Sequence, residues 1–314
     1  MRSLRIVVII AAAGVFFVFP AMLDFLADWL WFGEVGYRQV YSTEISARAI
    51  AGGLSFVIAM AWLAVNARLA LAAMSPGVQT FQTRDGLTVA LPTRDQVQPL
   101  LMILAAIGSL LVASFVSSQW ITLLSWWQQV PFGKSDPILG HDAAMYVFTL
   151  PAMELLRGLG LALVLLAAVG VTAIYFAAGQ VVLTPFGLRV EDRARRHLAW
   201  LGVALFLMLA AGAWLNRLQE IVSTSGIIQG ASYADVYGRI PAALAHALAA
   251  LVGAALCAAT ALGNSNRHAI AAAVIYGLVM LGGEGYASLL QRFAVTPNEQ
   301  VRETPFMEYN IAAT

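Results

Sequence analysis

The stretch His197-Leu-Ala-Trp-Leu-Gly-Val-Ala-Leu-Phe-Leu-Met-Leu-Ala-Ala-Gly-Ala-Trp-Leu215 decides the fold of this chain. It contains no aspartate, glutamate, lysine or arginine. A helix rises about 1.5 Å per residue, so about 20 apolar residues span the roughly 30 Å hydrocarbon core of a bilayer. Water is absent from that core, and the backbone there must pair its own polar groups within a helix. We therefore predict a transmembrane helix over residues 197–215.

Six further stretches meet the same criterion, and together they predict an all-α fold, an integral membrane bundle of seven transmembrane helices. They are residues 6–23, 49–66, 99–116, 150–176, 241–262 and 269–290. The segment between Arg157 and Arg189 carries no charge but is too short for two spans and a turn. We expect one tilted helix there.

The composition supports the same class of protein. Of the 314 residues, 60% are hydrophobic and 11% are charged, against about 45–50% and about 25% in soluble domains. So few charges exclude a soluble enzyme and a disordered chain. The net charge of +1 excludes a nucleic-acid-binding module, because phosphate contacts require a basic excess. The single cysteine, Cys257, supports neither a disulfide framework nor a cysteine-built metal site.

A cluster of charges indicates how the chain crosses the membrane. The segment Arg189-Val-Glu-Asp-Arg-Ala-Arg-Arg196 is the densest basic cluster in the sequence, and basic residues in short loops remain cytoplasmic. We therefore expect a cytoplasmic N-terminus and an extracytoplasmic C-terminus. The cluster is expected to fix this topology, and contact with anionic lipid or a partner is the alternative. On the same side, Asp85-Gly86 indicates a turn in a polar strand or loop within the link 67–98.

Aromatic residues crowd two of the predicted outer segments. Residues 24–37 contain Trp29, Trp31 and Phe32, and residues 120–148 contain three further tryptophans. Amphipathic aromatic rings prefer the headgroup zone of a bilayer. We expect short interfacial helices on the outer face, which form an aromatic belt. A docking surface for another domain is the alternative.

Asp136, His141 and Asp142 lie close together in the second of these segments. Calcium requires about six to eight oxygen ligands, more than these three side chains supply. We expect Asp136 to begin a turn and Asp142 to cap the helix that follows. The sequence therefore predicts no metal site, and it contains no recognisable catalytic or cofactor-binding motif.

Four ionisable residues fall within the predicted spans, namely Glu154, Arg157, His246 and Glu284. With the expected topology they all lie in the outer third of the bilayer. Such groups usually face the bundle interior or a cavity. We expect an internal network in which Glu154 pairs with Arg157, and His246 contacts Glu284 directly or through one water. The alternative is a polar vestibule that admits an ion or a proton, or that seats an extracytoplasmic partner.

The sixth predicted helix carries small residues at a regular spacing. Ala245, Ala249, Gly253 and Cys257 follow one another at intervals of four. This spacing predicts a ridge against which a neighbouring helix packs closely. Cys257 is then a packing residue and not a nucleophile.

Four longer motifs resemble those of a known family. They are Asp28-Trp-Leu-Trp-Phe-Gly-Glu-Val-Gly-Tyr37, Phe132-Gly-Lys-Ser-Asp-Pro-Ile-Leu-Gly-His-Asp142, Tyr146-Val-Phe-Thr-Leu-Pro151 and Arg292-Phe-Ala-Val-Thr-Pro-Asn-Glu-Gln-Val-Arg-Glu-Thr-Pro305. With them the chain resembles uncharacterised protein family 0182, a large family of bacterial multi-pass membrane proteins. The resemblance implies a bacterial membrane protein that continues into an extracytoplasmic domain, and we expect the inner membrane. The seven predicted spans make up a transmembrane domain over residues 1–291. The resemblance also implies that residues 292–314 begin an extracytoplasmic segment. It implies no reaction and no catalytic residue.

These features lead us to expect a non-enzymatic membrane anchor or assembly subunit for an extracytoplasmic domain or membrane complex. Its partners would be the lipid bilayer and other membrane or extracytoplasmic subunits, with no nucleic acid and no cofactor. The alternative is a transporter or channel that uses the outer polar residues. Inverted repeats would favour a transporter, and none is recognisable in the sequence. An intramembrane enzyme would need a nucleophile and a base, and no such constellation is recognisable.

Overall fold

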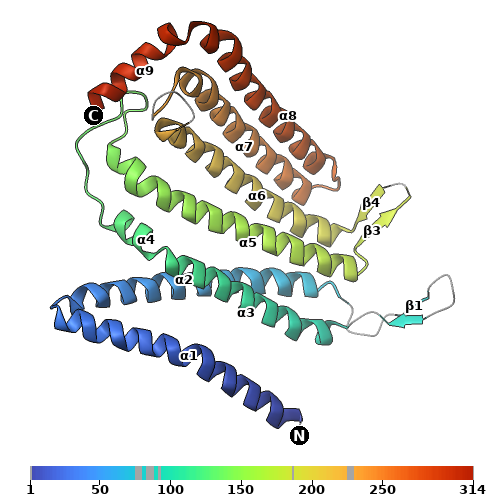
Figure 1. The fold of residues 1–314 in the computed structure, drawn as a ribbon. Helices are drawn as coiled ribbons and strands as arrows, with labels where there is room; N and C mark the ends of the chain where they lie inside the picture. The colour runs from blue at the N-terminus through green and yellow to red at the C-terminus, as the bar shows by residue number, and fades with distance from the viewer. Residues whose placement is uncertain are drawn as a thin grey trace.

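The computed structural model describes residues 2–74, 80–82, 88–90, 93–185, 187–224 and 230–313. Within them the chain is almost entirely helical, with four short strands (Figure 1). Seven helical segments are long and apolar enough to cross a membrane, which is the number predicted from the sequence. The all-α fold class is thereby confirmed.

The elements are the following. The long helices are α1 (Arg2–Glu34), α2 (Arg38–Leu71), α3 (Arg94–Ser118), α5 (Leu150–Ala177), α6 (Asp192–Gln219), α7 (Ile240–Leu262) and α8 (Arg267–Leu290). The short ones are α4 (Trp120–Trp127), α9 (Glu299–Ala313), the 3-10 turns η2 (Glu220–Val222) and η5 (Thr296–Asn298), and the π-helical turns η1 (Met145–Thr149), η3 (Asp235–Arg239) and η4 (Gln291–Val295). Strand β1 (Thr80–Gln82) pairs with β2 (Thr88–Ala90), and β3 (Val181–Thr184) pairs with β4 (Gly187–Val190), both antiparallel.

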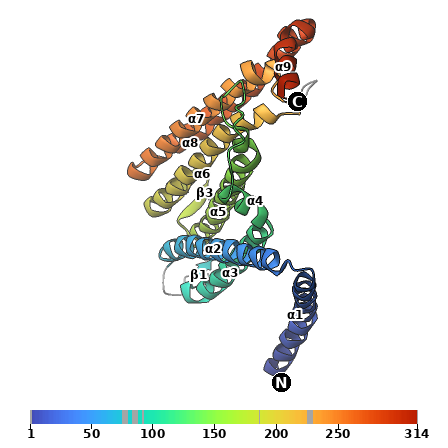
Figure 2. The same cartoon turned by 90° about the vertical axis from the view of Figure 1, so that its left-hand side faces the viewer.

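Three antiparallel helix pairs build the bundle, namely α2–α3, α5–α6 and α7–α8. Helix α6 also packs against α7, and α2 packs against α5. We call the end where the strands lie the hairpin end and the opposite end, where α9 lies, the α9 end (Figure 1). Figure 2 shows α2 and α3 running across the direction of α5 to α8, which lie side by side.

Helix α1 contradicts the outer loop predicted over residues 24–37. It continues to Glu34, and α2 begins at Arg38, well before the predicted start at residue 49. No glycine or proline interrupts residues 21–32, and the chain turns only at Gly36, where φ is 81°. The aromatic residues that suggested an interfacial helix instead join α1 to α2, since Phe32 stacks on Tyr41 with ring centroids 5.0 Å apart. The rest of α1 stands apart from the bundle (Figure 2).

The segment before the fourth span agrees with its prediction more closely. Residues 120–127 form the short helix α4, as expected. The single helix predicted over residues 150–176 is α5, which follows directly on η1. The π-helical turn ends just before Pro151, and the Leu150 N–H donates to the Met145 carbonyl five residues back. Proline lacks the N–H that a regular helix would use next, so the wider turn stands where the helical pattern is interrupted.

Two of the helix pairs are joined by similar β-hairpins. The expected strand in the link 67–98 is present as β1 paired with β2, and the turn predicted at Asp85-Gly86 lies outside the described residues. Residues 79–89 and 180–190 share the pattern Gln-x-x-x-Thr-x-x-Gly-Leu-x-Val. Because α2–α3 and α5–α6 also run in the same order, the chain contains a direct repeat of helix, hairpin and helix. In an inverted repeat, the second helix–hairpin–helix unit would instead run in the opposite direction to the first.

Small residues allow α6, α7 and α8 to approach closely. Their buried core consists of Phe206, Ala210, Ala250, Ala254, Cys257 and Ala272. A Cβ on Gly202 would lie 3.0 Å from the Cys257 sulfur, which agrees with a packing role for Cys257. Ala249 and Gly253 are also buried, as predicted, but Ala245 is exposed. The predicted ridge is therefore wrong at its first member, because the buried face of α7 turns toward Ala243 and Ala247 at this end.

We predict that Gly253→Leu destabilises the bundle. A Cβ at Gly253 would lie 2.5 Å from the Phe206 ring, so the larger side chain forces the ring and α6 apart at a cost of about 1–3 kcal/mol. The measurement is the melting temperature of the purified protein in detergent. Gly277→Leu is the matched control, because a Cβ there meets no described atom within 4 Å. Equal melting temperatures for Gly253→Leu and the unchanged protein would contradict the packing argument.

Candidate functional site

The four ionisable residues predicted within the spans all lie toward the α9 end. Glu154 and Arg157 are on α5, His246 is on α7 and Glu284 is on α8. Helices α5 and α7 begin at this end and α8 finishes there. The structure separates the four into two groups on either side of α6.

Glu154 and Arg157 lie between α5 and α6 and do not form the expected pair with each other. The Glu154 carboxylate accepts a hydrogen bond from the side-chain amide of Gln219 instead. The Arg157 guanidinium packs on Gly212, where a Cβ would lie 3.3 Å from Nη1. Its buried Nε has no hydrogen-bond partner among the described residues. Gly212 of α6 has no side chain and thus leaves room for the arginine. The i,i+3 ion pair expected from spacing alone is not present in the described structure.

His246 and Glu284 line one polar cavity between α6, α7 and α8. The cavity has a volume of about 260 Å³, and Asn216, Glu220 and Arg239 also line it. His246 Nε2 lies 3.2 Å from the Val279 carbonyl oxygen, so this nitrogen donates to the backbone of α8. The two predicted residues therefore share a cavity, while the hydrogen bond described for the imidazole goes to Val279. A contact through one water stays a prediction.

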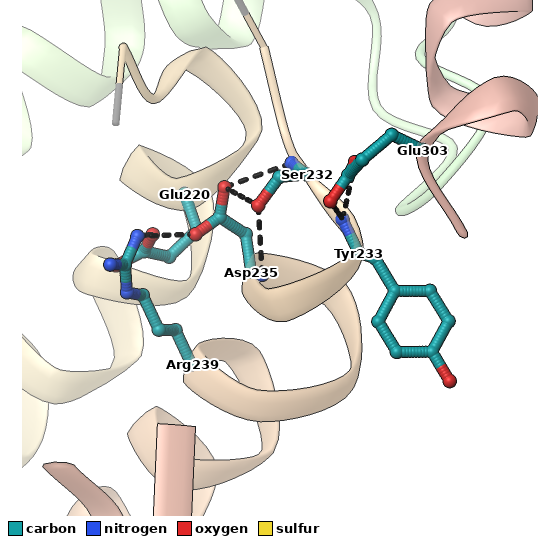
Figure 3. Close-up of polar contacts among 6 residues, drawn as sticks. All are labelled: Glu220, Ser232, Tyr233, Asp235, Arg239 and Glu303. Carbon is teal, nitrogen blue, oxygen red and sulfur yellow. Dashed lines mark hydrogen bonds and ion pairs between the residues drawn. The ribbon is translucent and has the colours of Figure 1, made fainter. Parts of the chain in front are cut away.

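The strongest polar network at the α9 end was not found from the sequence. We define the α9-end network as Glu220, Ser232, Tyr233, Asp235, Arg239 and Glu303 (Figure 3). Asp235 is 0% exposed and accepts hydrogen bonds from the Ser232 N–H at 2.8 Å and the Ser232 hydroxyl at 2.9 Å. Arg239 Nη1 lies 2.5 Å from the Asp235 carboxylate and 3.7 Å from that of Glu220. A fully buried charge is thus paired and hydrogen-bonded, as its burial requires.

A recognisable pattern could have revealed part of this network. The segment Ser232-Tyr-Ala-Asp235 is a capping box of the form Ser-x-x-Asp ahead of an apolar run. Pro241 suggested a helix start at that residue, whereas the helical turns begin earlier, with η3 at Asp235. As before α5, the π-helical turn ends just before the proline, and the Ile240 N–H donates to the Asp235 carbonyl. Glu220 and Glu303 carry no comparable local signal, because their partners are distant in sequence.

Helix α9 is held to this end of the bundle by a buried carboxylate. Glu303 is 4% exposed and accepts the Tyr233 N–H at 3.0 Å and 3.3 Å on its two oxygens. Arg302 donates to the Tyr233 hydroxyl at 3.1 Å, and Phe306 packs edge-on against the same ring. Residues 292–314, predicted to start an extracytoplasmic segment, therefore include a helix that packs on the bundle.

The loop before α5 is organised by the two aspartates discussed for a metal site. Asp136 accepts the N–H groups of Ile138, Leu139 and His141 and the hydroxyl of Tyr146. Asp142 accepts the Ala144 N–H at 2.8 Å and caps the following helix. The predicted turn and cap are therefore confirmed. Burial opposes ionisation of Asp136, but the hydrogen bonds from Tyr146 and the backbone outweigh it and lower the pKa of Asp136 below its ordinary value.

The site can bind charge but is closed toward the hairpin end. Two carboxylates and one guanidinium line the cavity, so its formal charge favours a proton or a small cation. Toward the hairpin end, the buried core around Phe206 and Ala254 fills the space between α6, α7 and α8. Within the part of the chain that the structure describes, no three His, Cys, Asp or Glu side chains could hold a metal ion together. The geometry indicates a polar structural joint at one end of an apolar bundle.

Comparison with known proteins gives one family. The sequence matches Uncharacterised protein family (UPF0182) over residues 4–314. It is similar to UPF0182 proteins of Geobacter sulfurreducens (35% identical), Pelobacter propionicus (33%) and Kineococcus radiotolerans (33%). These alignments cover 100%, 100% and 92% of this chain but 36%, 35% and 29% of the relatives, so the chain spans about a third of their length. No solved structure matches.

We predict that Glu303→Ala releases α9 from the bundle. The change leaves the Tyr233 N–H without its acceptor, at a local cost of about 1–3 kcal/mol. The measurement is the rate of amide hydrogen exchange in α9, which should rise. Glu303→Gln retains an amide oxygen and should restore most of the protection, and Glu308→Ala, at an exposed position of α9, should leave the rate unchanged. Equal rates for Glu303→Ala and Glu308→Ala would show that the buried carboxylate does not hold α9.

We predict that the contribution of Asp136 to stability is lost in acid. Its pKa is lowered in the folded state, so the contribution is complete above the unfolded pKa of about 3.9 and disappears as the pH falls through the folded pKa. At pH 6.5, Asp136→Asn should cost roughly 1–2 kcal/mol, and the deficit should shrink below pH 4. The measurement is the melting-temperature difference from the unchanged protein at each pH. Asp24→Asn, at an exposed position of α1, is the control, and a deficit constant with pH would contradict the assignment.

Proposed function

Because the chain belongs to the uncharacterised protein family UPF0182, we propose a function from its own geometry. In this proposal the protein is a non-enzymatic membrane anchor or assembly subunit that holds an extracytoplasmic domain or neighbouring membrane proteins at its α9 end. The observation that carries the proposal is the α9-end network, in which buried Asp235 and Glu303 fasten η3 and α9 to the bundle. Desolvation makes buried charges costly, and in some proteins they specify a single geometry; we assign that role to Asp235 and Glu303.

The proposed setting is the bacterial inner membrane, with the hairpin end cytoplasmic and the α9 end extracytoplasmic. Seven helices of sufficient length and apolar character support insertion. The arginines that open α6, among them Arg193 and Arg196, support a cytoplasmic hairpin end.

The α9 end also offers a surface suited to a protein partner. A groove of about 380 Å³ lies between the loop at Pro137 and α9, and Tyr237, Arg302, Phe306 and Tyr309 line it. Tyrosine and arginine are the residues most enriched where protein interfaces gain their affinity. The groove lies beside the fixed joint made by Tyr233 and Glu303, so a partner seated there would be held rigidly.

Transport remains the second candidate because His246 and Glu284 line a polar cavity. A conducting path would have to continue to the hairpin end, where the core around Phe206 is buried and apolar. The anchor therefore has the better support.

We predict that a photoreactive benzoylphenylalanine at Tyr237 or Tyr309 of the full chain, in living bacteria, forms protein adducts. Both side chains line the groove and are about half exposed. Matched positions are Leu281, midway along α8, and Leu188, at the hairpin end, which are 74% and 56% exposed and should form none. The readout is a shift in mass on a denaturing gel. Adducts absent from the α9 end, together with an ion flux in proteoliposomes that His246→Ala and Glu284→Gln abolish, would replace the anchor with a transporter.

A further inference from the structure

A second cavity lies near the hairpin end, in a groove between α2 and α6. Its volume is about 670 Å³. Trp62, Val65 and Leu69 line it from α2, at the three- and four-residue spacing of one helix face, while Arg193, Arg196 and Trp200 line it from α6. Val65, Leu69 and Trp200 are each about half exposed, so the groove is open along its side. It presents apolar walls with two arginines at one end.

The floor of the groove is a fixed chain of hydrogen bonds. His197 Nε2 lies 2.9 Å from the Asn66 amide oxygen, and His197 Nδ1 lies 3.0 Å from the Tyr175 hydroxyl. The Asn66 amide nitrogen in turn donates to the Trp62 carbonyl at 2.8 Å. A neutral imidazole that donates from Nε2 and accepts at Nδ1 satisfies both contacts. The polar groups of the floor are therefore engaged with one another.

The charges at the mouth of the groove are not balanced. Asp192 also lines it, but its carboxylate lies 2.7 Å from Arg195 Nη1. Arg193 donates to the Ala72 carbonyl at 3.0 Å, which holds its guanidinium beside the end of α2. Arg196 makes no ion pair or hydrogen bond with any described residue. Two guanidinium groups thus border the groove, and the one carboxylate that lines it is already paired.

We propose that this groove binds an anionic phospholipid. Arg193 and Arg196 hold the phosphate, because a guanidinium matches phosphate with two parallel hydrogen bonds. One acyl chain lies along Val65, Leu69 and Trp200. A free phosphate would use only the arginines, and a neutral lipid would use only the apolar wall. Basic pockets between transmembrane helices are sites of this kind. The proposal rests on membrane insertion but not on the anchor function.

The test is the melting temperature of the detergent-solubilised full chain during titration with phosphatidylglycerol. We expect a saturable rise that phosphatidylcholine does not produce. Arg193→Gln combined with Arg196→Gln should weaken the apparent affinity about tenfold or more. Arg189→Gln combined with Arg267→Gln removes the same charge from exposed positions outside the groove and should leave the affinity unchanged. Equal weakening by the two pairs would overturn the site in favour of unspecific charge attraction.

Two further measurements distinguish binding of the whole lipid from binding of its phosphate group alone. Val65→Trp fills the apolar wall and keeps both arginines, so it should abolish the response to phosphatidylglycerol. Inorganic phosphate alone should produce no comparable rise. A full rise with phosphate, or an unchanged lipid response in Val65→Trp, would assign the arginines to a free anion and overturn the lipid. If the double variant melts lower without lipid, the single variant Arg196→Gln decides, because that side chain makes no hydrogen bond or ion pair with a described residue.

Discussion

An apolar helix in a hydrocarbon environment has only its own backbone and its neighbours as polar partners, and in the proposed membrane setting most of this structure follows from that constraint. Lipid is as apolar as leucine, so helices there associate through close packing and polar contacts. Helices α6 and α7 meet at Gly202 beside Cys257 and at Gly253 beside Phe206, and η3 meets α8 at Gly238 beside Ala287. At each contact the glycine has no side chain, so the neighbouring element lies closer than a larger residue at that position would allow.

The same constraint makes the helix ends the places where polar chemistry collects. Pro151 and Pro241 each lack an N–H, and each follows a π-helical turn whose last hydrogen bond spans five residues. Asp142 precedes the first of these turns and accepts the Ala144 N–H. At the start of the second turn, Asp235 accepts the Ser232 N–H, and the Ser232 hydroxyl accepts the Asp235 N–H. The same combination of an aspartate, a π-helical turn and a proline thus stands at the start of both α5 and α7. At α7 the aspartate also pairs with Arg239. Asp235 is buried because the helical turn that begins with it lies inside the protein.

Sequence patterns predicted the features that depend on composition along one segment. Seven apolar stretches predicted seven long helices, and Asp136 and Asp142 predicted a turn and a cap. Patterns failed where a distant partner decides: Glu154 pairs with Gln219 because α6 lies beside it, and Arg157 rests on Gly212 for the same reason. The aromatic residues 24–37 were assigned to the bilayer surface on chemical type alone, although residues 21–32 contain no glycine or proline and the helix simply continues through them. Glu303 was invisible because its partner Tyr233 lies 70 residues away.

The two ends of the bundle differ in how their charges are compensated, and this difference separates their proposed roles. At the α9 end, Asp235 and Glu303 are buried and accept hydrogen bonds from Ser232, Arg239 and Tyr233. In such a network the buried carboxylates are already paired within the protein. At the hairpin end, Arg193 and Arg196 are exposed beside an open apolar groove, so their charge is available to an outside anion. A protein that is rigid at one end and adhesive to anionic lipid at the other has the properties of an anchor. In the proposed setting, the arginines would hold the protein in its leaflet and the α9 end would present a fixed surface on the far side.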